Sequence, residues 1–192
     1  MTSYLISGPA AEPLTLDEAR AFVRKDDTGE DALLASLVTA ARLHVESVTG
    51  RALISQSWRL PLDCWPDDRV VPLPVGPVLS LTSITAYDLT GASSSLSLDG
   101  VLLDAKGAPP RLFLPAALTP GVVLRERQGI EIDYLAGYGT DPADVPAGLR
   151  QAVLLLVGYW FENRDALAIA GSGALVPSGF DQLVAPYRAV RL

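Results

Sequence analysis

The sequence predicts an α+β protein: a small helical bundle, made of two N-terminal helices and a long third helix, with a β-rich insertion between helices two and three and a C-terminal tail. Three observations support this prediction. Apolar residues recur at helical spacing at both ends of the chain, and nine prolines between residues 61 and 120 exclude long helices from the middle. Hydrophobic residues make up 49% of the 192 positions, enough to form a core. We expect the bundle to comprise residues 1–52 and 144–192 and the insertion residues 53–143.

Two helices are predicted in the N-terminal part. The first spans residues 16–25, because Thr15 and Glu18 have the spacing of a capping box, in which each side chain bonds the other residue's backbone N–H. The second spans residues 30–49, with apolar residues on one stripe and Gly50 as its stop signal.

Short strands are predicted in the insertion, where β-branched and aromatic clusters alternate with turn residues. We expect them at residues 55–62, 70–73, 80–87, 96–103, 111–114 and 129–135, with a flexible serine-rich hairpin at 91–95. Residues 61–110 hold six acidic and two basic side chains, which makes them the most acidic stretch.

A third helix is predicted from residue 146 to about residue 168, with Pro146 in its first turn. Residues 152–157 are apolar on all sides, so the helix must be covered from several directions, and a neighbouring subunit is a candidate for part of that cover. The apolar run 152–161 is too short to cross a bilayer, so no membrane association is expected. No signal peptide is recognised at the N-terminus, which predicts a cytosolic protein.

The sequence offers little for catalysis. It contains one histidine and one cysteine, whereas disulfides and zinc sites need several such residues. His44 lies beside the apolar stripe of the second helix and is interpreted as a packed side chain, and Cys64 is interpreted as a small buried one. The acidic pairs within residues 67–68 and 141–144 are interpreted as turns and helix caps. We therefore predict no catalytic residue, no metal ligand and no cofactor.

The net charge of −7 argues against non-specific binding of DNA, because proteins that hold phosphates do so mainly with an excess of lysine and arginine. Two other classes of function remain open. One is a monomeric β domain that binds a small ligand or a glycan, and it would have a measurable ligand. The other is a hydrolase that uses acid and base side chains, and it would need paired carboxylates facing one cleft.

Several segments, each short but in a consistent order, carry a resemblance that covers nearly the whole chain. They are LTLDEAR at residues 14–20, AARLHVESVTGRAL at 40–53, the strand around Trp58 with LDCWP at 62–66, VPLP at 71–74, PV at 77–78, YLAGYG at 134–139, the segment 145–164, and VPSG at 176–179 through PYR at 186–188. Together they resemble the head–tail connector (adaptor) proteins of long-tailed bacteriophages and of the related gene transfer agents.

The resemblance implies a structural role without an active site. Such adaptors form a ring, commonly of twelve copies, below the portal and above the stopper or tail, and the ring extends the channel through which DNA leaves. The implied partners are further copies of the chain, the portal protein and a stopper or tail-completion protein, while DNA passes without specific binding. The protein would be found in the bacterial cytoplasm during assembly and then in the neck of the particle. A net charge of −7 per subunit suits this role, because an acidic wall repels the phosphates of sliding DNA.

Two candidate contact regions follow. We expect subunit contacts in the ring to involve the third helix, with Arg150, Glu162 and Arg164 as contributors. We expect the tail, residues 174–192, to dock on the portal, because the flexible Gly171–Ser172–Gly173 hinge is followed by a segment too apolar for a solvated linker. Its candidate docking residues are Leu175, Phe180, Leu183, Tyr187, Arg188 and Arg191. The alternative is that the tail folds back on its own bundle as a fourth helix.

Overall fold

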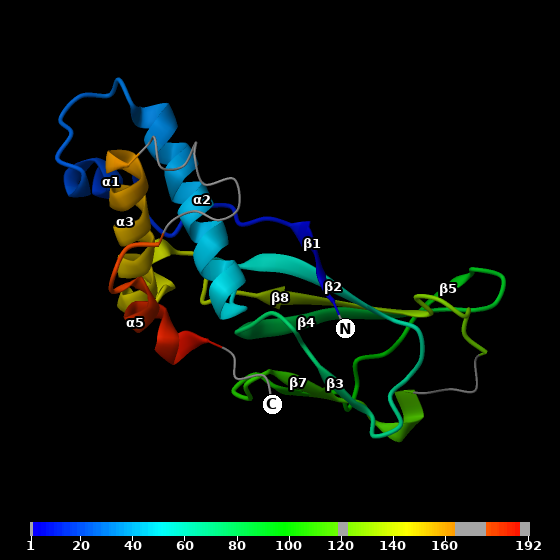
Figure 1. The fold of residues 1–192 in the computed structure, drawn as a ribbon. Helices are drawn as coiled ribbons and strands as arrows, with labels where there is room; N and C mark the ends of the chain where they lie inside the picture. Colours follow the sequence, from blue (N-terminus) through cyan, green and yellow to red (C-terminus); the bar gives the residue numbers. More distant parts are fainter. Residues whose placement is uncertain (1, 119–122, 164–175, 189–192) are drawn as a thin grey trace. The chain divides into compact units, whose positions relative to one another are not determined.

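The computed structural model describes residues 2–118, 123–163 and 176–188 (Figure 1). The chain divides into two compact units. The described residues of the helical unit lie within 10–54 and 138–188, and those of the β unit lie within 2–9 and 55–137. Helices occupy one unit and antiparallel sheets the other, so the predicted α+β class is confirmed.

The described helices of the helical unit have well-defined ends. They are α1 (Leu16–Phe22), α2 (Asp31–Thr49), α3 (Ala147–Glu162) and α5 (Phe180–Val184), with 3₁₀ turns η2 (Pro142–Asp144) and η3 (Ala185–Tyr187). The predicted capping box of Thr15 and Glu18 starts α1, and Gly50, in the left-handed conformation at φ 68°, ends α2. Helix α1 is shorter than predicted, and the chain turns away through Arg24 at φ 57°.

Helix α3 also differs from its predicted span. Pro146 is the N-cap residue, at ψ 135°, rather than part of the first turn. The helix ends at Glu162 because Asn163 leaves the helical conformation, at ψ 51°, and its side-chain amide donates a hydrogen bond to the Tyr159 carbonyl at 2.8 Å. The rest of the predicted span, from residue 164 onward, lies outside the described residues.

The core of the helical unit lies where α2 and α3 meet, with α1 and α5 packed around them (Figure 1). Helix α2 contributes one apolar face, which is buried. Its apolar members are Leu34, Leu37, Val38, Ala41 and Val45. The apolar α3 is surrounded by α1, α2 and α5 of its own chain, so its central residues are buried without help from another subunit. None of the described helices is long and apolar enough to span a membrane.

A buried arginine joins three segments of the helical unit. Arg42 on α2 pairs with Glu12 at 2.7 Å and with Glu46 at 2.9 Å, and only 8% of its side chain is exposed. Glu46 also accepts a hydrogen bond from the backbone N–H of Leu53 at 2.9 Å. Burial alone lowers the pKa of Arg42, but the hydrogen bonds and negative charges of Glu12 and Glu46 outweigh it and raise that pKa. The guanidinium therefore stays charged and ties the chain before α1 to α2, and through Glu46 to the chain after it.

The β unit contains two antiparallel sheets, drawn one above the other in Figure 1. The five-stranded sheet has the order β1 (Tyr4–Ser7), β2 (Gln56–Leu62), β8 (Ile130–Ala136), β4 (Val78–Tyr87), β5 (Ser93–Ser95). The three-stranded sheet has the order β3 (Val70–Pro72), β7 (Arg111–Phe113), β6 (Leu102–Asp104), and the 3₁₀ turn η1 (Ala116–Leu118) follows β7.

Two strands differ from the sequence predictions. Strand β1 was not predicted, because all four of its residues are exposed and it exists only through pairing with β2. The strand predicted at 96–103 is wrong. Residues 93–95 form β5, where the flexible hairpin was expected, and a turn at Gly100, with φ 77°, separates them from β6. Because glycine adopts positive φ without strain, it reverses the chain there.

Candidate interaction surfaces

His44 is a packed side chain, as predicted. Its ring lies 5.9 Å from that of Trp160 on α3 and 5.4 Å from that of Phe180 on α5, measured between centroids. Burial lowers its pKa below the ordinary value of 6.5, because the apolar surroundings disfavour the charged imidazolium. His44 is therefore held neutral among aromatic rings, which is the environment of a structural histidine.

The prediction for Cys64 is wrong, since this side chain is exposed. It lies in the turn after β2, where Asp63 is exposed as well. Apolar neighbours in the sequence suggested burial, but a turn between two sheets leaves its side chains in solvent.

The acidic pairs perform the capping roles predicted for them. Asp141 and Asp144 form a reciprocal capping box around η2, and Asp68 accepts a hydrogen bond from the Val70 N–H at 3.0 Å. Within the described residues, no group of three or more His, Cys, Asp or Glu side chains is placed to hold a metal ion. These carboxylates serve turns instead of facing one another across a cleft.

Arg150 is engaged inside its own helical unit. From α3 its Nε donates a hydrogen bond to the Pro13 carbonyl at 3.2 Å, and its guanidinium pairs with the Glu18 carboxylate. The pKa of Glu18 is lowered, first by the hydrogen bond from the Thr15 backbone and further by Arg150. One carboxylate thus caps α1 and anchors α1 to α3. The contribution of Arg150 to a subunit interface stays a prediction.

Glu162, the second predicted contact residue, borders a groove of about 530 Å³ between α1 and α3. The groove is lined by Phe22, Val23, Arg24, Leu155, Gly158, Tyr159, Glu162 and Pro177. A Cβ at Gly158 would lie 2.6 Å from Cε1 of Phe22, so glycine lets this ring lie directly on α3. Phe22 is nevertheless 41% exposed. The groove is thus open to solvent and combines apolar side chains with polar and charged ones.

The two charged residues of this groove are available for contacts. Arg24 and Glu162 are both exposed, and neither side chain has an ion-pair or hydrogen-bond partner in the part of the chain that the structure describes. An open groove that combines apolar side chains with charges of both signs is typical of a protein contact surface. Arg164, the third predicted contact residue, lies outside the described residues.

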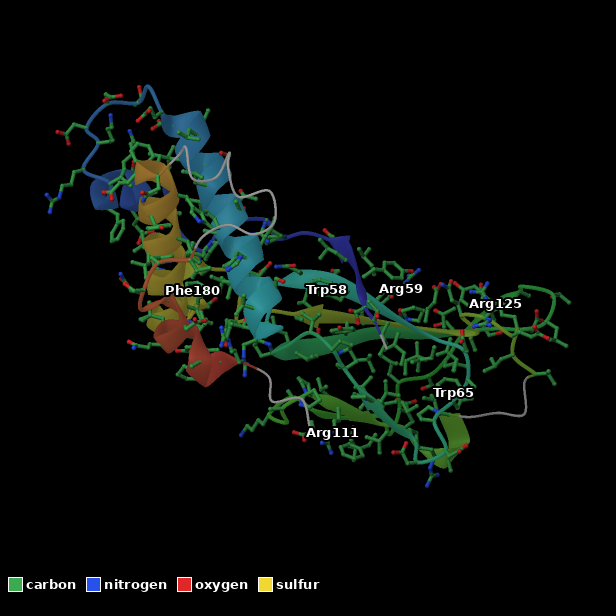
Figure 2. The ribbon with its side chains drawn as sticks, in the orientation of Figure 1. Trp58, Arg59, Trp65, Arg111, Arg125 and Phe180 are labelled. Carbon is green, nitrogen blue, oxygen red and sulfur yellow. The ribbon has the colours of Figure 1, made fainter. Side chains whose placement is uncertain are left out.

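The predicted portal-docking tail packs on its own helical unit over residues 176–188 (Figure 2). Phe180 is 1% exposed and Val184 is fully buried, while Leu183 and Tyr187 are half-buried against the same core. The backbone carbonyl of Tyr187 accepts a hydrogen bond from Arg51 Nε at 2.6 Å. The prediction of docking away from its own unit is therefore wrong for these residues, and the fold-back alternative describes them.

The physical reason lies in the spacing of the tail residues. Phe180, Leu183, Val184 and Tyr187 stand at positions i, i+3, i+4 and i+7, so two turns of helix place all of them on one face. Arg188 faces Asp181 of the same segment and pairs with it. Leu175 and Arg191 lie outside the described residues, and their docking on a portal stays a prediction.

The outer face of the five-stranded sheet carries a network that the sequence did not reveal (Figure 2). Arg59 on β2 bonds Asp133 on β8 through Nε at 2.6 Å and Nη2 at 2.7 Å, and pairs with Glu131 at 2.8 Å. Tyr87 donates to Glu131 at 2.9 Å, and the Arg125 guanidinium lies 4.0 Å from the Tyr87 ring centre. Opposite charges on two predicted strands, Arg59 within residues 55–62 and Asp133 within residues 129–135, could have indicated this network. Only the strand order, which places β2 beside β8, makes Arg59 face Asp133.

A second exposed apolar surface lies on the three-stranded sheet. Phe113 pairs in register with Val70 on one side and Leu102 on the other, and Leu102 and Phe113 are 67% and 40% exposed. Their neighbours Val71 and Leu112 point to the opposite face and are fully buried. An apolar row on the outer face of a sheet is typical of an interaction surface.

Chains similar to this one over its whole length occur in solved structures of gene transfer agent (GTA) particles. A chain in the neck of an empty GTA particle, computed with sixfold symmetry, is 30% identical, with a TM-score of 0.82. A chain in the virion of a native GTA particle has the same identity and TM-score, and one in the neck of a native particle, computed with twelvefold symmetry, has a TM-score of 0.80. Each match covers 100% of this chain and 97% of the other.

No protein-family model matches the sequence, and no curated protein matches it by sequence. The structural likeness nevertheless extends through both units, because the matched region is the entire chain. An identity of 30% kept over 97% of the related chain, together with the common fold, shows that this protein belongs to the family of head–tail neck proteins of gene transfer agent particles.

Proposed function

We propose that this protein is a head–tail connector (adaptor) subunit, twelve copies of which form a ring in the particle neck. The ring lies between the portal and the stopper or tail and extends the channel through which DNA leaves the head. The observation that carries the proposal is the full-length similarity to chains from necks computed with sixfold and twelvefold symmetry. Both symmetries are compatible with twelve copies around one axis.

The charge of the chain supports a role in a channel. Twelve subunits of net charge −7 concentrate a negative field around the axis, which repels DNA phosphates over about one Debye length, roughly 8 Å at physiological salt. DNA therefore slides past the ring without specific binding.

The described side chains support a structural rather than a catalytic role. His44 is packed between aromatic rings, and the acidic pairs at residues 67–68 and 141–144 lie in turns and caps. The carboxylates on the outer sheet face are held by arginines. We expect no catalytic activity and no cofactor, with assembly in the cytoplasm followed by incorporation into the neck.

The test is to delete the gene and examine the particles by electron microscopy. A connector of head and tail predicts heads and tails that accumulate separately, and a plasmid copy of the gene should restore tailed particles. Tailed particles of normal appearance and number in the deletion strain would overturn the proposal.

Localisation provides an independent measurement. An image of the complemented particles, averaged without imposed symmetry, is expected to show density for the chain between portal and tail, repeated twelve times. Density at the tail tip or on the capsid surface would contradict the connector role even if tails were lost.

A further inference from the structure

The outer face of α2 has an unusual composition for an exposed helix. Its solvent-facing positions recur over four turns on the side opposite the buried stripe. They are Ala32, Ala35, Ser36, Ala40, Leu43 and Ser47, and none is charged. Leu43 is 53% exposed. Solvated helix faces normally carry charged residues, so an uncharged face of small side chains with one leucine is suited to close packing against another protein surface.

This face and the groove between α1 and α3 lie on opposite sides of the helical unit. Helices α2 and α3 pack against each other through their buried stripes. At about 100° per residue, the groove residues Leu155 and Glu162 lie about 120° or more around α3 from Leu149 and Val153 of its buried stripe, and Tyr159 lies at the edge of that stripe. The outer face of α2 likewise points away from its own buried stripe.

Two different contact faces on opposite sides are what a closed ring of many copies requires. In a twelvefold ring each copy is turned by about 30° from the next, so every copy uses one face toward one neighbour and a nearly opposite face toward the other. We propose that the outer face of α2 in one copy packs into the α1–α3 groove of the next copy. This inference rests on the proposed ring and identifies the contact that closes it.

Each of the two surfaces combines apolar and polar groups. The groove floor contains the exposed ring of Phe22, which lies on Gly158, and the side chain of Leu155. An uncharged helix face fills such a floor without burying an unpaired charge, and Leu43 supplies an apolar side chain that projects from it. Arg24 and Glu162, which lack partners within the described residues, are available to polar groups at the rim of the contact.

The size of the α2 face predicts that this contact alone does not hold free chains together. Residues 32–47 span about 24 Å of helix, and with a width of about 10 Å the contact covers roughly 240 Å² on each copy. A stable isolated dimer needs about 800 Å² on each partner. The free chain is therefore expected to be monomeric, and the ring forms where the neck holds each copy beside two neighbours.

Cross-linking in assembled particles tests the contact. The chain contains one cysteine, Cys64, which is exposed, so Cys64→Ser provides a background without other thiols. Ser36→Cys on α2 and Glu162→Cys in the groove are then introduced together, and particles are treated with a short bis-maleimide. The matched control combines Leu89→Cys, exposed in the β4–β5 turn, with Glu162→Cys.

The expected result is a ladder of covalent multimers that extends beyond the dimer on a denaturing gel, because each copy is joined to two neighbours. The control pair and the single-cysteine variants should give no ladder. Tailed particles that contain the double variant but give no ladder would overturn the proposed contact and leave the connector role intact. Absence of the Cys64→Ser chain itself from particles would instead contradict the connector role.

A second variant checks the same contact without cross-linking. Ala40→Arg places a charge in the middle of the α2 face, which is exposed in the subunit, so the melting temperature of the purified chain should be unchanged. Tailed particles are expected to fall by about tenfold or more, since the charge would be buried at the contact. Leu89→Arg should leave particle yield unchanged. A normal yield with Ala40→Arg would overturn the inference.

Discussion

The substitution Phe180→Ala measures whether the C-terminal segment is part of the helical core. Phe180 is 1% exposed, and its ring lies 5.4 Å from that of His44. Removing a buried phenylalanine side chain costs about 3–5 kcal/mol, because apolar contacts are lost and a cavity remains. At a typical urea dependence of about 2 kcal/mol per molar, the unfolding midpoint of the helical unit should fall by about 1.5–2.5 M.

Far-UV circular dichroism near the helix minimum is a suitable assay, because the described α-helices all belong to the helical unit. Gln182→Ala provides the control on the same helix, since Gln182 is exposed, and its effect should stay within about 0.5 kcal/mol. A midpoint for Phe180→Ala within about 0.3 M of the unchanged protein would refute the packing of α5 on the core. Truncation before residue 176 is likewise expected to destabilise the unit.

Three further predictions concern single side chains. Arg42→Met should destabilise the helical unit by about 3 kcal/mol, because Glu12 and Glu46 lose their common cation; urea unfolding measures the change. His44 makes stability depend on pH: burial lowers its pKa below 6.5, so the unfolded chain binds the proton first as pH falls. The stabilisation of the folded chain by neutral His44 is complete above pH 6.5 and is lost as the pH falls through the lowered pKa. His44→Phe should therefore make the free energy of unfolding depend less on pH, measured by urea midpoints between about pH 7.5 and 5.5. Cys64→Ser should change stability by less than about 0.5 kcal/mol, measured by thermal melting, because the side chain is exposed.

Controls distinguish these effects from general perturbation. Arg24→Met removes an exposed arginine without an ion pair in the described chain, so it should leave stability nearly unchanged. A loss as large as that of Arg42→Met would show that the buried pairing is not the cause. An unchanged pH dependence in His44→Phe would assign the titration to other groups. A large loss in Cys64→Ser would contradict the exposure of that side chain.

Local signals in the sequence were sufficient to predict where α1 begins and where α2 ends. The Thr15–Glu18 capping box and Gly50 act within one or two turns of the backbone, so the start of α1 and the end of α2 could be predicted from neighbouring residues. Alternation and turn residues likewise located most strands of the insertion. The length of α1 and the strand at 96–103 were predicted wrongly, because positive φ at Arg24 and the turn at Gly100 interrupt otherwise plausible patterns.

The candidate surfaces depended on packing between distant segments. Glu162 was predicted from the sequence as a subunit-contact residue, which stays a prediction, and the groove beside it exists only because Phe22 of α1 lies on Gly158 of α3. Arg150 was predicted as a subunit-contact residue, and only the fold brings Pro13 and Glu18 within its reach. Such contacts join residues more than a hundred positions apart, which no local pattern encodes.

By itself the sequence determined the α+β class, the net negative charge, the presence of only one histidine and one cysteine, and the resemblance to head–tail connectors. Composition, periodicity and short motifs can all be established without knowing which distant residues pack together. The tertiary structure alone decided that Phe180 belongs to the core, that Cys64 is exposed, and that β1 completes a sheet. An apolar segment such as 180–187 is equally suited to its own core or to a partner. The choice depends on whether a matching surface is already available within the chain, and α2 and α3 provide one.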